Sequence, residues 1–262
     1  FFFIIMYIYM PFVKNSDEAK AKMELVRNAR QHKKKIPLSP VLKDTNIEVD
    51  EMELPKDKFM LLLNIIMELQ RDIDYLIAPS YDWIEIDDRY DGNGTYLNSL
   101  SDNGDNGDDV ETVSLPFNFR FYGQEYESLS ICSNGWISFG ETDLSSFRNY
   151  PLPGAGGPGK MVAVFWDDLK LTNSGRVYTW YDEINKLFIV QWSRVRTFQN
   201  NTSETFQVIL KDPMYYTTPT GDGEIVMQYL DFNNDTNGSY SWSQIHGNYC
   251  TIGLEDHTMK RG

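Results

Sequence analysis

The sequence predicts an all-β fold, an antiparallel β-sandwich of about ten strands preceded by a short helical N-terminal segment. The first observation is a series of short apolar runs from residue 81 onward, separated by stretches rich in Gly, Asn, Asp and Pro. The second is Asn134-Gly135, which stands between two alternating runs and is expected to close a two-residue hairpin. The third is that no segment with helical periodicity interrupts these runs, which argues against a parallel α/β sheet.

The first 74 residues differ from the rest of the chain in periodicity, charge and aromatic content. Residues 1–12 are almost wholly apolar but too short to span a bilayer, so they fit either a truncated signal or anchor or a hydrophobic stub. Residues 16–35 are expected to form a helix, and Lys58–Asp72 carries apolar residues at helical spacing. We therefore predict a partly helical segment of unassigned function over 1–74 and a separate β-domain over 75–262.

Each expected strand is marked by alternation or by a short apolar run between turn signals. Trp83–Ile86 is expected to form a short strand, and the polar stretch Asp87–Asp109 a loop. Thr112–Tyr122 alternates, with its apolar residues on one face, and Met161–Trp166 is apolar throughout, as expected of a buried strand. The remaining expected strands are Leu129–Cys132, Ile137–Phe139, Gly175–Tyr181, Leu187–Val195, Thr205–Leu210, Glu224–Tyr229 and Tyr249–Leu254.

The net charge of −14 is carried entirely by the β-region. Residues 1–80 contain 12 basic and 12 acidic side chains, whereas residues 81–262 contain 12 basic and 26 acidic ones. An acidic domain repels phosphate backbones and anionic membranes, so nucleic-acid binding is disfavoured. The same acidity fits a secreted protein or one that collects calcium.

An ordered set of motifs carries a family resemblance over about residues 75–262. The set contains the Asn-Gly hairpin, a Phe-Trp-Asp strand, a Gly-Arg-Val-Tyr strand and a Thr-Phe-Gln-Val strand. Its members, in chain order, are Ser133–Gly140, Val164–Leu169, Gly175–Tyr178, Thr205–Leu210 and Thr251–Glu255. No single motif is specific, but the order resembles the nidogen-type extracellular β-domain.

The match looks closer still to an accessory β-domain of large secreted bacterial proteins. These include gingipain-type cysteine peptidases and subtilisin-type peptidases exported by the type IX route. The segments similar to that domain are Tyr81–Ile86, Leu115–Phe119, Phe147–Pro151 and Pro219–Ile225. The resemblance implies an extracellular or cell-surface location and a further strand beyond Gly262. No membrane span is expected in this chain, because its apolar first residues are too short.

The resemblance also implies a non-catalytic accessory or adhesion module of a larger secreted or cell-surface protein. Its expected partners are extracellular matrix, glycans or neighbouring domains of the same chain. Two alternatives stay open: a fragment of a secreted peptidase whose catalytic residues lie outside this chain, and a carbohydrate-binding module. None of the three histidines, His32, His246 and His257, lies in a recognisable motif with Ser or Cys, so no catalytic residue is predicted.

An Asp-rich loop is the best candidate for a cofactor site, and the cofactor it would take is calcium. Asp102, Asp105, Asp108 and Asp109 offer several hard oxygens within a short stretch that also contains glycines. The alternative is a solvated acidic loop with no ligand, because the spacing does not fit a helix-loop-helix calcium loop. Asp167 and Asp168, at the end of a buried strand, are a second candidate for a structural cation or for turn capping.

Cysteines and exposed aromatic residues give two further candidate features. Cys132 and Cys250 lie in expected strands near the two ends of the β-region and are either a disulfide or two buried free thiols. Flat aromatic side chains on a sandwich face can stack on sugar rings. Candidates for such a ligand-binding row are Trp180, Tyr181, Tyr240 and Trp242.

Overall fold

The computed structural model describes residues 6–9, 81–104, 107–198, 201–233 and 250–262. The chain divides into two compact units, and every described residue belongs to the unit made of Phe1–Pro11 and Tyr81–Gly262. The helices expected before residue 74 lie outside the described residues. Among the described residues, no helix has the length and apolar character needed to cross a membrane.

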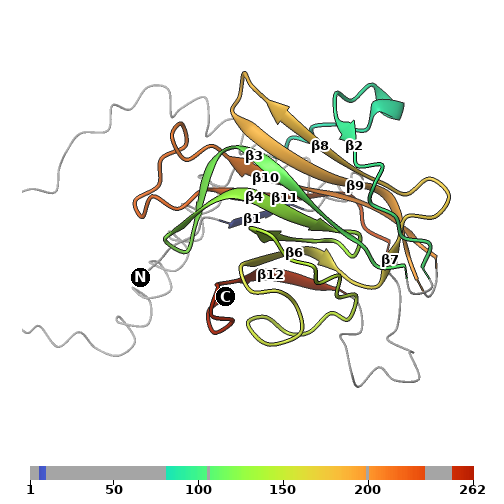
Figure 1. Cartoon of the computed structure of the whole chain (residues 1–262). Helices are drawn as coiled ribbons and strands as arrows, with labels where there is room; N and C mark the ends of the chain where they lie inside the picture. Colours follow the sequence, from blue (N-terminus) through green and yellow to red (C-terminus); the bar gives the residue numbers. More distant parts are fainter. Residues whose placement is uncertain (1–5, 10–80, 105–106, 199–200, 234–249) are drawn as a thin grey trace, which may run out of the picture. The chain divides into compact units, whose positions relative to one another are not determined.

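The described unit is a β-sandwich of two sheets, as predicted (Figure 1). One sheet has five strands in the order β12 (Thr251–Glu255), β6 (Met161–Trp166), β5 (Trp136–Phe139), β4 (Gln124–Cys132) and β3 (Val110–Phe121). The other has seven strands, six of them in the order β1 (Met6–Tyr9), β11 (Ile225–Asp231), β10 (Ser203–Lys211), β9 (Leu187–Thr197), β8 (Arg176–Asp182) and β2 (Thr95–Tyr96). The seventh strand, β7 (Leu169–Lys170), pairs with β9 beside this path. All pairs between named strands are antiparallel except β1 with β11.

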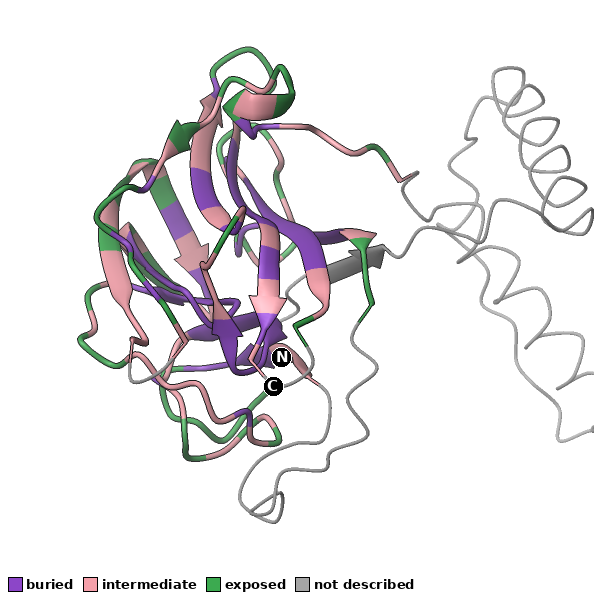
Figure 2. Ribbon diagram, turned by 90° about the vertical axis from the view of Figure 1, so that its right-hand side faces the viewer, coloured by how far each residue is buried: buried purple, intermediate pink, exposed green. Residues whose placement is uncertain are grey.

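Aromatic side chains fill the space between the two sheets. Phe165 of β6 stacks on Phe206 of β10 with ring centroids 5.1 Å apart, and Trp192 of β9 lies against the same Phe206 ring, also at 5.1 Å. Farther along, Phe119 of β3 stacks on Phe139 of β5 at 5.0 Å. Figure 2 shows buried residues along the strands of both layers, where the sheets face each other. Burial of these rings is the main force that holds the sandwich together.

The predicted alternation of β3 is confirmed. Its burial falls and rises with every residue over most of its length, and Phe119 and Phe121 are fully buried at its end. The continuous apolar run Met161–Trp166 is also confirmed as a strand, and every one of its residues is buried. The short strands β2 and β7 were not expected, because two-residue pairings leave no pattern in a sequence.

The predicted two-residue hairpin is wrong in its length. Cys132 pairs with Trp136 across β4 and β5, so the turn contains three residues, Ser133, Asn134 and Gly135. Gly135 adopts a left-handed conformation with φ +76°, whereas Asn134 does not take a positive φ. A three-residue turn needs only one left-handed position, at its last residue, which explains the difference.

The predicted strand Trp83–Ile86 is also wrong. This segment runs extended but makes no strand pairing, and it leads into the short 3₁₀ helix η1 (Asp88–Tyr90). Side chains of the large sheet supply the missing partners: the Ile86 amide donates to Gln191 Oε1 at 3.2 Å, and Gln207 Nε2 donates to the Ile84 carbonyl at 3.2 Å. The segment is therefore held by side chains of β9 and β10.

Candidate functional site

Three loops meet at the Ser133–Gly135 turn, at one end of the small sheet. The first is the acidic loop between β2 and β3, the second is the turn itself, and the third is the Asp167–Asp168 link between β6 and β7. Ser133 and Asn134 are fully buried, which is unusual for turn residues, and their side chains bond to the other two loops. The turn therefore organises this end of the molecule.

Ser133 binds the acidic loop. Its hydroxyl donates to Asp102 Oδ2 at 2.7 Å and accepts from the Asp109 amide at 3.2 Å. The second oxygen of Asp102 accepts from the Gly104 amide at 2.8 Å, and the Asp102 carbonyl accepts from the Leu171 amide at 2.8 Å. Asp102 is thus a buried carboxylate that joins the acidic loop to the turn and to the chain after β7.

Asn134 binds three separate segments through its side chain. Its Nδ2 donates to Asp108 Oδ1 at 2.9 Å and to the Ser145 carbonyl at 3.3 Å. Its Oδ1 accepts from the Leu169 amide at 2.9 Å. A single buried amide therefore fixes the position of Asp108 relative to the loop after β5 and the start of β7.

Asp102, Asp108 and Asp168 form what we call the loop-end acidic cluster. Burial raises the pKa of Asp102 to about 6; hydrogen bonds from Ser133 and Gly104 oppose the rise, and the charges of Asp108 and Asp109 add to it. Burial likewise raises the pKa of Asp108, against the hydrogen bond from Asn134. The cluster therefore combines burial with mutual repulsion of its carboxylates.

Asp168 has the most perturbed carboxylate of the cluster. It is only 6% exposed, and no hydrogen bond to its side-chain oxygens is found among the described residues. Burial and the charges of Asp108 and Asp102 raise its pKa to about 7, while nearby Lys170 acts in the opposite direction. At neutral pH this carboxyl is consequently divided between its protonated and charged forms.

We expect Asp168→Asn to stabilise the protein at alkaline pH. The folded-state pKa lies above the ordinary value, so the stability that this carboxyl contributes is complete below about pH 4 and is lost as pH rises toward 7. Asparagine does not titrate, so the variant should exceed the wild type by about 2–4 kcal/mol at pH 8 and match it near pH 4. Urea unfolding at both pH values measures this difference; equal gains at both would contradict it.

The calcium prediction receives no support from the side-chain positions. Among the residues that the structure describes, no group of three or more His, Cys, Asp or Glu side chains is arranged to hold a metal ion. Asp105 of the predicted set lies outside the described residues, and Asp109 uses its carboxylate to accept from the Ser101 and Val110 amides at 2.9 Å each. Asp167, the partner predicted for Asp168, accepts from the Asp168 amide at 2.9 Å.

An open pocket of 690 Å³, here called the loop pocket, adjoins this cluster. Asp108 contributes to its wall, and the rest comes from the long loop between β5 and β6, including Phe147, Arg148 and Tyr150. The Arg148 guanidinium lies 5.3 Å from the centre of the Phe147 ring. The pocket thus offers aromatic surface together with one acidic and one basic side chain.

Two buried indoles anchor the wall of the loop pocket. Trp136 Nε1 and Trp166 Nε1 both donate to the Ser146 carbonyl, each at 2.9 Å. The Ser146 hydroxyl donates to the Gly156 carbonyl at 2.7 Å, which joins the two ends of the loop. The pocket is therefore built on the fixed tryptophans of the small sheet.

The two cysteines are free thiols in the structure, so the alternative of a disulfide is not realised there. Cys132 is buried and Cys250 is half-buried. Burial raises the pKa of both thiols, that of Cys250 to about 12 with help from Asp167 and Glu204. Neither has the lowered pKa of a catalytic thiolate.

We expect both thiols to resist a thiol-specific chromogenic disulfide reagent in the native protein at pH 8. In concentrated guanidinium chloride without reductant, two thiols per chain should react, because unfolding restores their ordinary pKa. An absorbance titration measures both states. No reaction after unfolding would instead indicate that the two cysteines are bonded.

The predicted aromatic row is not a single surface in the described residues. Trp180 packs against a small cluster around Ile86 and Tyr178, whereas Tyr181 packs against the main core and lies 6.0 Å from Phe117. Successive residues of a strand point to opposite faces, which separates the two side chains. Tyr240 and Trp242 lie outside the described residues.

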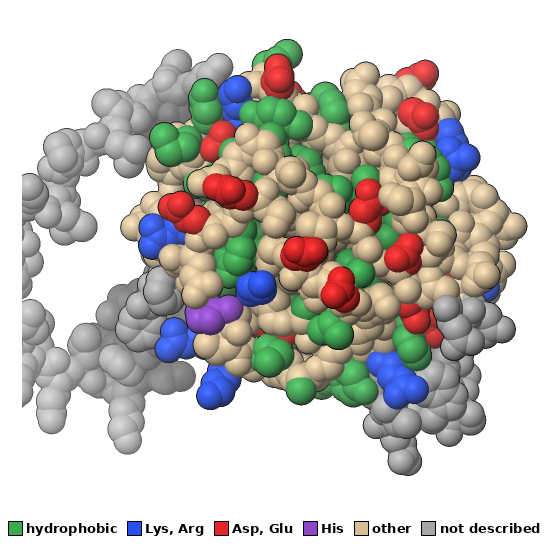
Figure 3. Space-filling model, in the orientation of Figure 1, with side chains coloured by type: hydrophobic (Ala, Val, Ile, Leu, Met, Phe, Trp, Pro, Cys, Tyr) green, Lys and Arg blue, Asp and Glu red, His purple; other side chains and the backbone are tan. Residues whose placement is uncertain are grey.

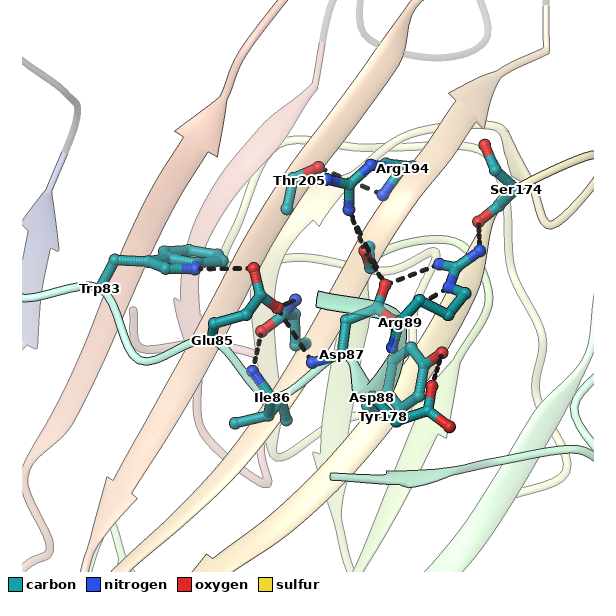
Figure 4. A network of polar contacts seen from close by, with 12 residues as sticks. Trp83, Glu85, Ile86, Asp87, Asp88, Arg89, Ser174, Tyr178, Arg194 and Thr205 are labelled. Carbon is teal, nitrogen blue, oxygen red and sulfur yellow. Dashed lines mark hydrogen bonds and ion pairs between the residues drawn. The ribbon is translucent and has the colours of Figure 1, made fainter. Parts of the chain in front are cut away.

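A second buried polar network attaches the segment before β2 to the large sheet (Figure 4). Asp87 is fully buried and accepts from Arg89 Nη2 at 2.6 Å, from Arg89 Nε at 2.9 Å and from Ser193 Oγ at 2.6 Å. Arg194 adds an ion pair at 3.8 Å, and Glu85 accepts from Gln191 Nε2 at 2.7 Å. The carboxylates of Asp87 and Glu85 find their hydrogen-bond and ion-pair partners within the chain, so we assign the network a structural role.

On the face that Figure 3 shows, acidic side chains lie scattered among polar ones, and basic side chains lie mostly near the rim. This distribution agrees with the net charge of the β-region and gives no basic surface for nucleic acid on that face. The exposed His257 lies near the end of the chain and takes no part in the loop-end acidic cluster.

Sequence reasoning placed Asp102 and Asp108 in one candidate site and Asp168 in another, and it did not predict that the two come together. It also missed the roles of Ser133, Asn134, Phe147, Arg148 and Tyr150. One signal was available: a Ser-Asn pair next to a tryptophan strand offers both hydroxyl and amide groups to neighbouring loops. The sequence alone did not show which loops those would be.

The described residues form an all-β sandwich with three loops joined at the Ser133–Gly135 turn. A family model described as "NIDO related" matches residues 80–261, which is more than half of the chain. The chain therefore belongs to the NIDO-related family, as the resemblance to nidogen-type domains predicted. A search of curated proteins found no match, and a search of solved structures found none either. Domains of this family are usually extracellular and typically non-catalytic.

Proposed function

We propose that this chain is a non-catalytic binding module of a larger secreted or cell-surface protein, and that the loop pocket is its binding surface. The observation that carries the proposal is the junction of the pocket with the loop-end acidic cluster. Asp108 belongs to both, and it is held by a buried amide of a turn that also fixes the neighbouring loops. Binding sites are commonly loops positioned in this way by a rigid scaffold.

The chemistry of the site favours binding over catalysis. Ser133 donates directly to Asp102, with no imidazole between them to act as a base. Both thiols have raised pKa values. The loop pocket instead combines two aromatic rings with a carboxylate and a guanidinium, a set of groups that suits sugar hydroxyls or a polar peptide.

Two finer statements belong to this proposal. The module would serve as an accessory or adhesion domain in a bacterial protein of the gingipain or subtilisin type, exported by the type IX route. Its partners would be extracellular matrix, glycans or neighbouring domains. The alternative of a peptidase fragment is distinguished by the reading frame: extension into a His/Cys peptidase domain favours it, and extension into repeated β-domains favours adhesion.

The test is a binding screen of the full chain on a glycan array and on immobilised extracellular-matrix proteins. We expect binding to one of these two classes, weakened at least about tenfold by Tyr150→Ala or Arg148→Ala. Ile184→Ala is the matched control, because this residue is 91% exposed on the β8–β9 turn, outside the loop pocket.

Three results would overturn the proposal. The first is no binding to either class. The second is binding that both pocket variants retain in full while they remain folded by circular dichroism. The third is turnover of chromogenic peptide, ester or glycoside substrates by the purified chain, which would show a catalytic function.

A further inference from the structure

Two turns at one end of the large sheet expose apolar side chains to solvent. The first turn joins β8 to β9 and the second follows β10; both β8 and β10 run antiparallel to β9, so they end on the same side of the sheet (Figure 1). Ile184 of the first turn is 91% exposed, and Met214 and Tyr215 of the second are 84% and 65% exposed. These are the three most exposed large hydrophobic side chains of the described residues, and we call them the apolar tip.

Hydrogen bonds hold the two turns of the apolar tip side by side. The Asp212 amide donates to the Lys186 carbonyl at 3.0 Å, and the Tyr216 hydroxyl donates to the Asn185 carbonyl at 2.8 Å. The Lys186 ammonium lies 5.3 Å from the centre of the Tyr215 ring. The apolar tip is therefore one surface to which both turns contribute.

The amides of the three apolar residues all donate within the chain. The buried carboxylate of Asp182 accepts from the Ile184 amide at 3.0 Å, and that of Asp212 accepts from the Met214 amide at 2.9 Å. The Asp212 carbonyl accepts from the Tyr215 amide at 3.0 Å. An amide without a partner is costly in an apolar medium, so these bonds allow the tip to leave water without that cost.

The charges beside the apolar tip give it no positive surface. Lys211 is paired with Glu224 at 2.7 Å, and Lys186 shares its turn with the exposed Glu183. The two buried carboxylates beneath the turns add negative charge. Anionic lipids attract clusters of basic side chains, so this balance suits a lipid surface without net charge and disfavours an anionic one.

We propose that the apolar tip binds the surface of a zwitterionic lipid bilayer, with Ile184 and Met214 among the acyl chains and Tyr215 and Lys186 at the headgroups. Tyrosine and lysine suit that level because each joins an apolar body to a polar end. The area favours lipid over a protein partner. The three side chains expose on the order of 500 Å² together, whereas a specific protein interface needs about 800 Å² per partner.

The apolar tip and the loop pocket lie at opposite ends of β9. Leu187 pairs with Asp182 and Lys211 at the tip, whereas Thr197 pairs with Leu169 beside the loop-end acidic cluster. A strand of this length spans about 30 Å. Lipid binding at the tip is therefore separate from ligand binding in the loop pocket, and a domain held by its tip would present the pocket away from the bilayer.

The test measures co-sedimentation of the full chain with phosphatidylcholine vesicles. We expect the wild type to bind, and Ile184→Ser and Met214→Ser each to lower the partition coefficient at least about tenfold, because serine removes the apolar surface. Ile184→Leu and Met214→Leu are the matched controls, which keep an apolar side chain and should bind as the wild type does. Both positions are exposed, so all four variants should keep the wild-type circular dichroism spectrum.

Vesicles that also contain phosphatidylserine give the second measurement, and binding to them should be no stronger. A wild type that does not bind phosphatidylcholine vesicles would overturn the lipid partner. Equal binding by the wild type and both serine variants would overturn the apolar tip as the site, and binding that requires phosphatidylserine would overturn the neutral surface. The glycan and matrix screens for the loop pocket contain no lipid, so either proposal can fail without the other.

Discussion

Replacing Gly135 by alanine is expected to destabilise the protein by at least about 3 kcal/mol, because two independent penalties apply at this position. The residue has φ +76°, a conformation that side-chain-bearing residues adopt at a cost. A Cβ at this position would also overlap the Phe165 carbonyl oxygen of β6. That approach cannot relax easily, since the Gly135 carbonyl accepts from the Val164 and Phe165 amides at 3.1 and 2.9 Å.

Gly221→Ala is the matched control for this substitution. Gly221 has nearly the same conformation, with φ +77°, but an added Cβ would meet only the side chain of Arg120, at 3.5 Å. The Gly221→Ala variant should lose about 1 kcal/mol in free energy of unfolding, because only the backbone-conformation penalty applies there. Urea denaturation of both variants measures the contrast; equal losses would show that close approach to β6 contributes nothing.

Asp87→Asn is expected to cost about 2–4 kcal/mol at neutral pH. The carboxylate is fully buried and accepts hydrogen bonds from Arg89 and Ser193, and an amide replaces one of its acceptor oxygens by a donor. Asp88→Asn is the control, since Asp88 is exposed and accepts a hydrogen bond from the Tyr178 hydroxyl at 2.8 Å. It should cost less than about 1 kcal/mol.

The same variant has a pH signature. Burial alone would raise the pKa of Asp87, but hydrogen bonds from Arg89 and Ser193 outweigh it and hold the pKa well below its usual range. A carboxylate whose pKa is lowered by folding stabilises the folded state at pH values above its unfolded-state pKa. This stabilisation is lost as the pH falls toward the folded-state pKa. The difference between wild type and Asp87→Asn should therefore shrink below about pH 4 in thermal unfolding. A constant difference down to pH 2 would contradict the assignment.

Asp87 and Asp168 thus make opposite contributions with pH, although both are buried aspartates. The sign follows from their partners, which are guanidinium and hydroxyl donors for Asp87 and other carboxylates for Asp168. The wild type should consequently be most stable at a mildly acidic pH, where Asp87 is charged and Asp168 is still protonated.

The strands of the core could be predicted from the sequence because their signal is local. The alternation of β3 and the unbroken apolar run of β6 each require only the period of a strand and the need to bury one or both faces. The turn after Cys132 was predicted as a turn but with the wrong length, because Asn-Gly suits two- and three-residue turns alike.

The candidate site could be predicted only in fragments because its contacts are long-range. Ser133 and Asp102 are 31 residues apart in the chain, and Asn134 and the Leu169 amide are 35 apart. Composition indicated that the acidic loop was chemically special, but the pairing of side chains from three loops leaves no periodic pattern. The same reason explains the error at Trp83–Ile86, whose partners, Gln191 and Gln207, come from distant strands.

The Ser146 carbonyl, held by two tryptophan side chains, has a consequence for how this domain could diversify. A main-chain oxygen is present whatever residue occupies the position, so the anchor of the loop after β5 does not depend on the identity of residue 146. Neighbouring side chains such as Phe147 and Arg148 can therefore change while the loop keeps its attachment to the sheet. Because the anchor is a main-chain atom and the pocket is lined by side chains, the binding specificity of the loop can change while the fold stays the same.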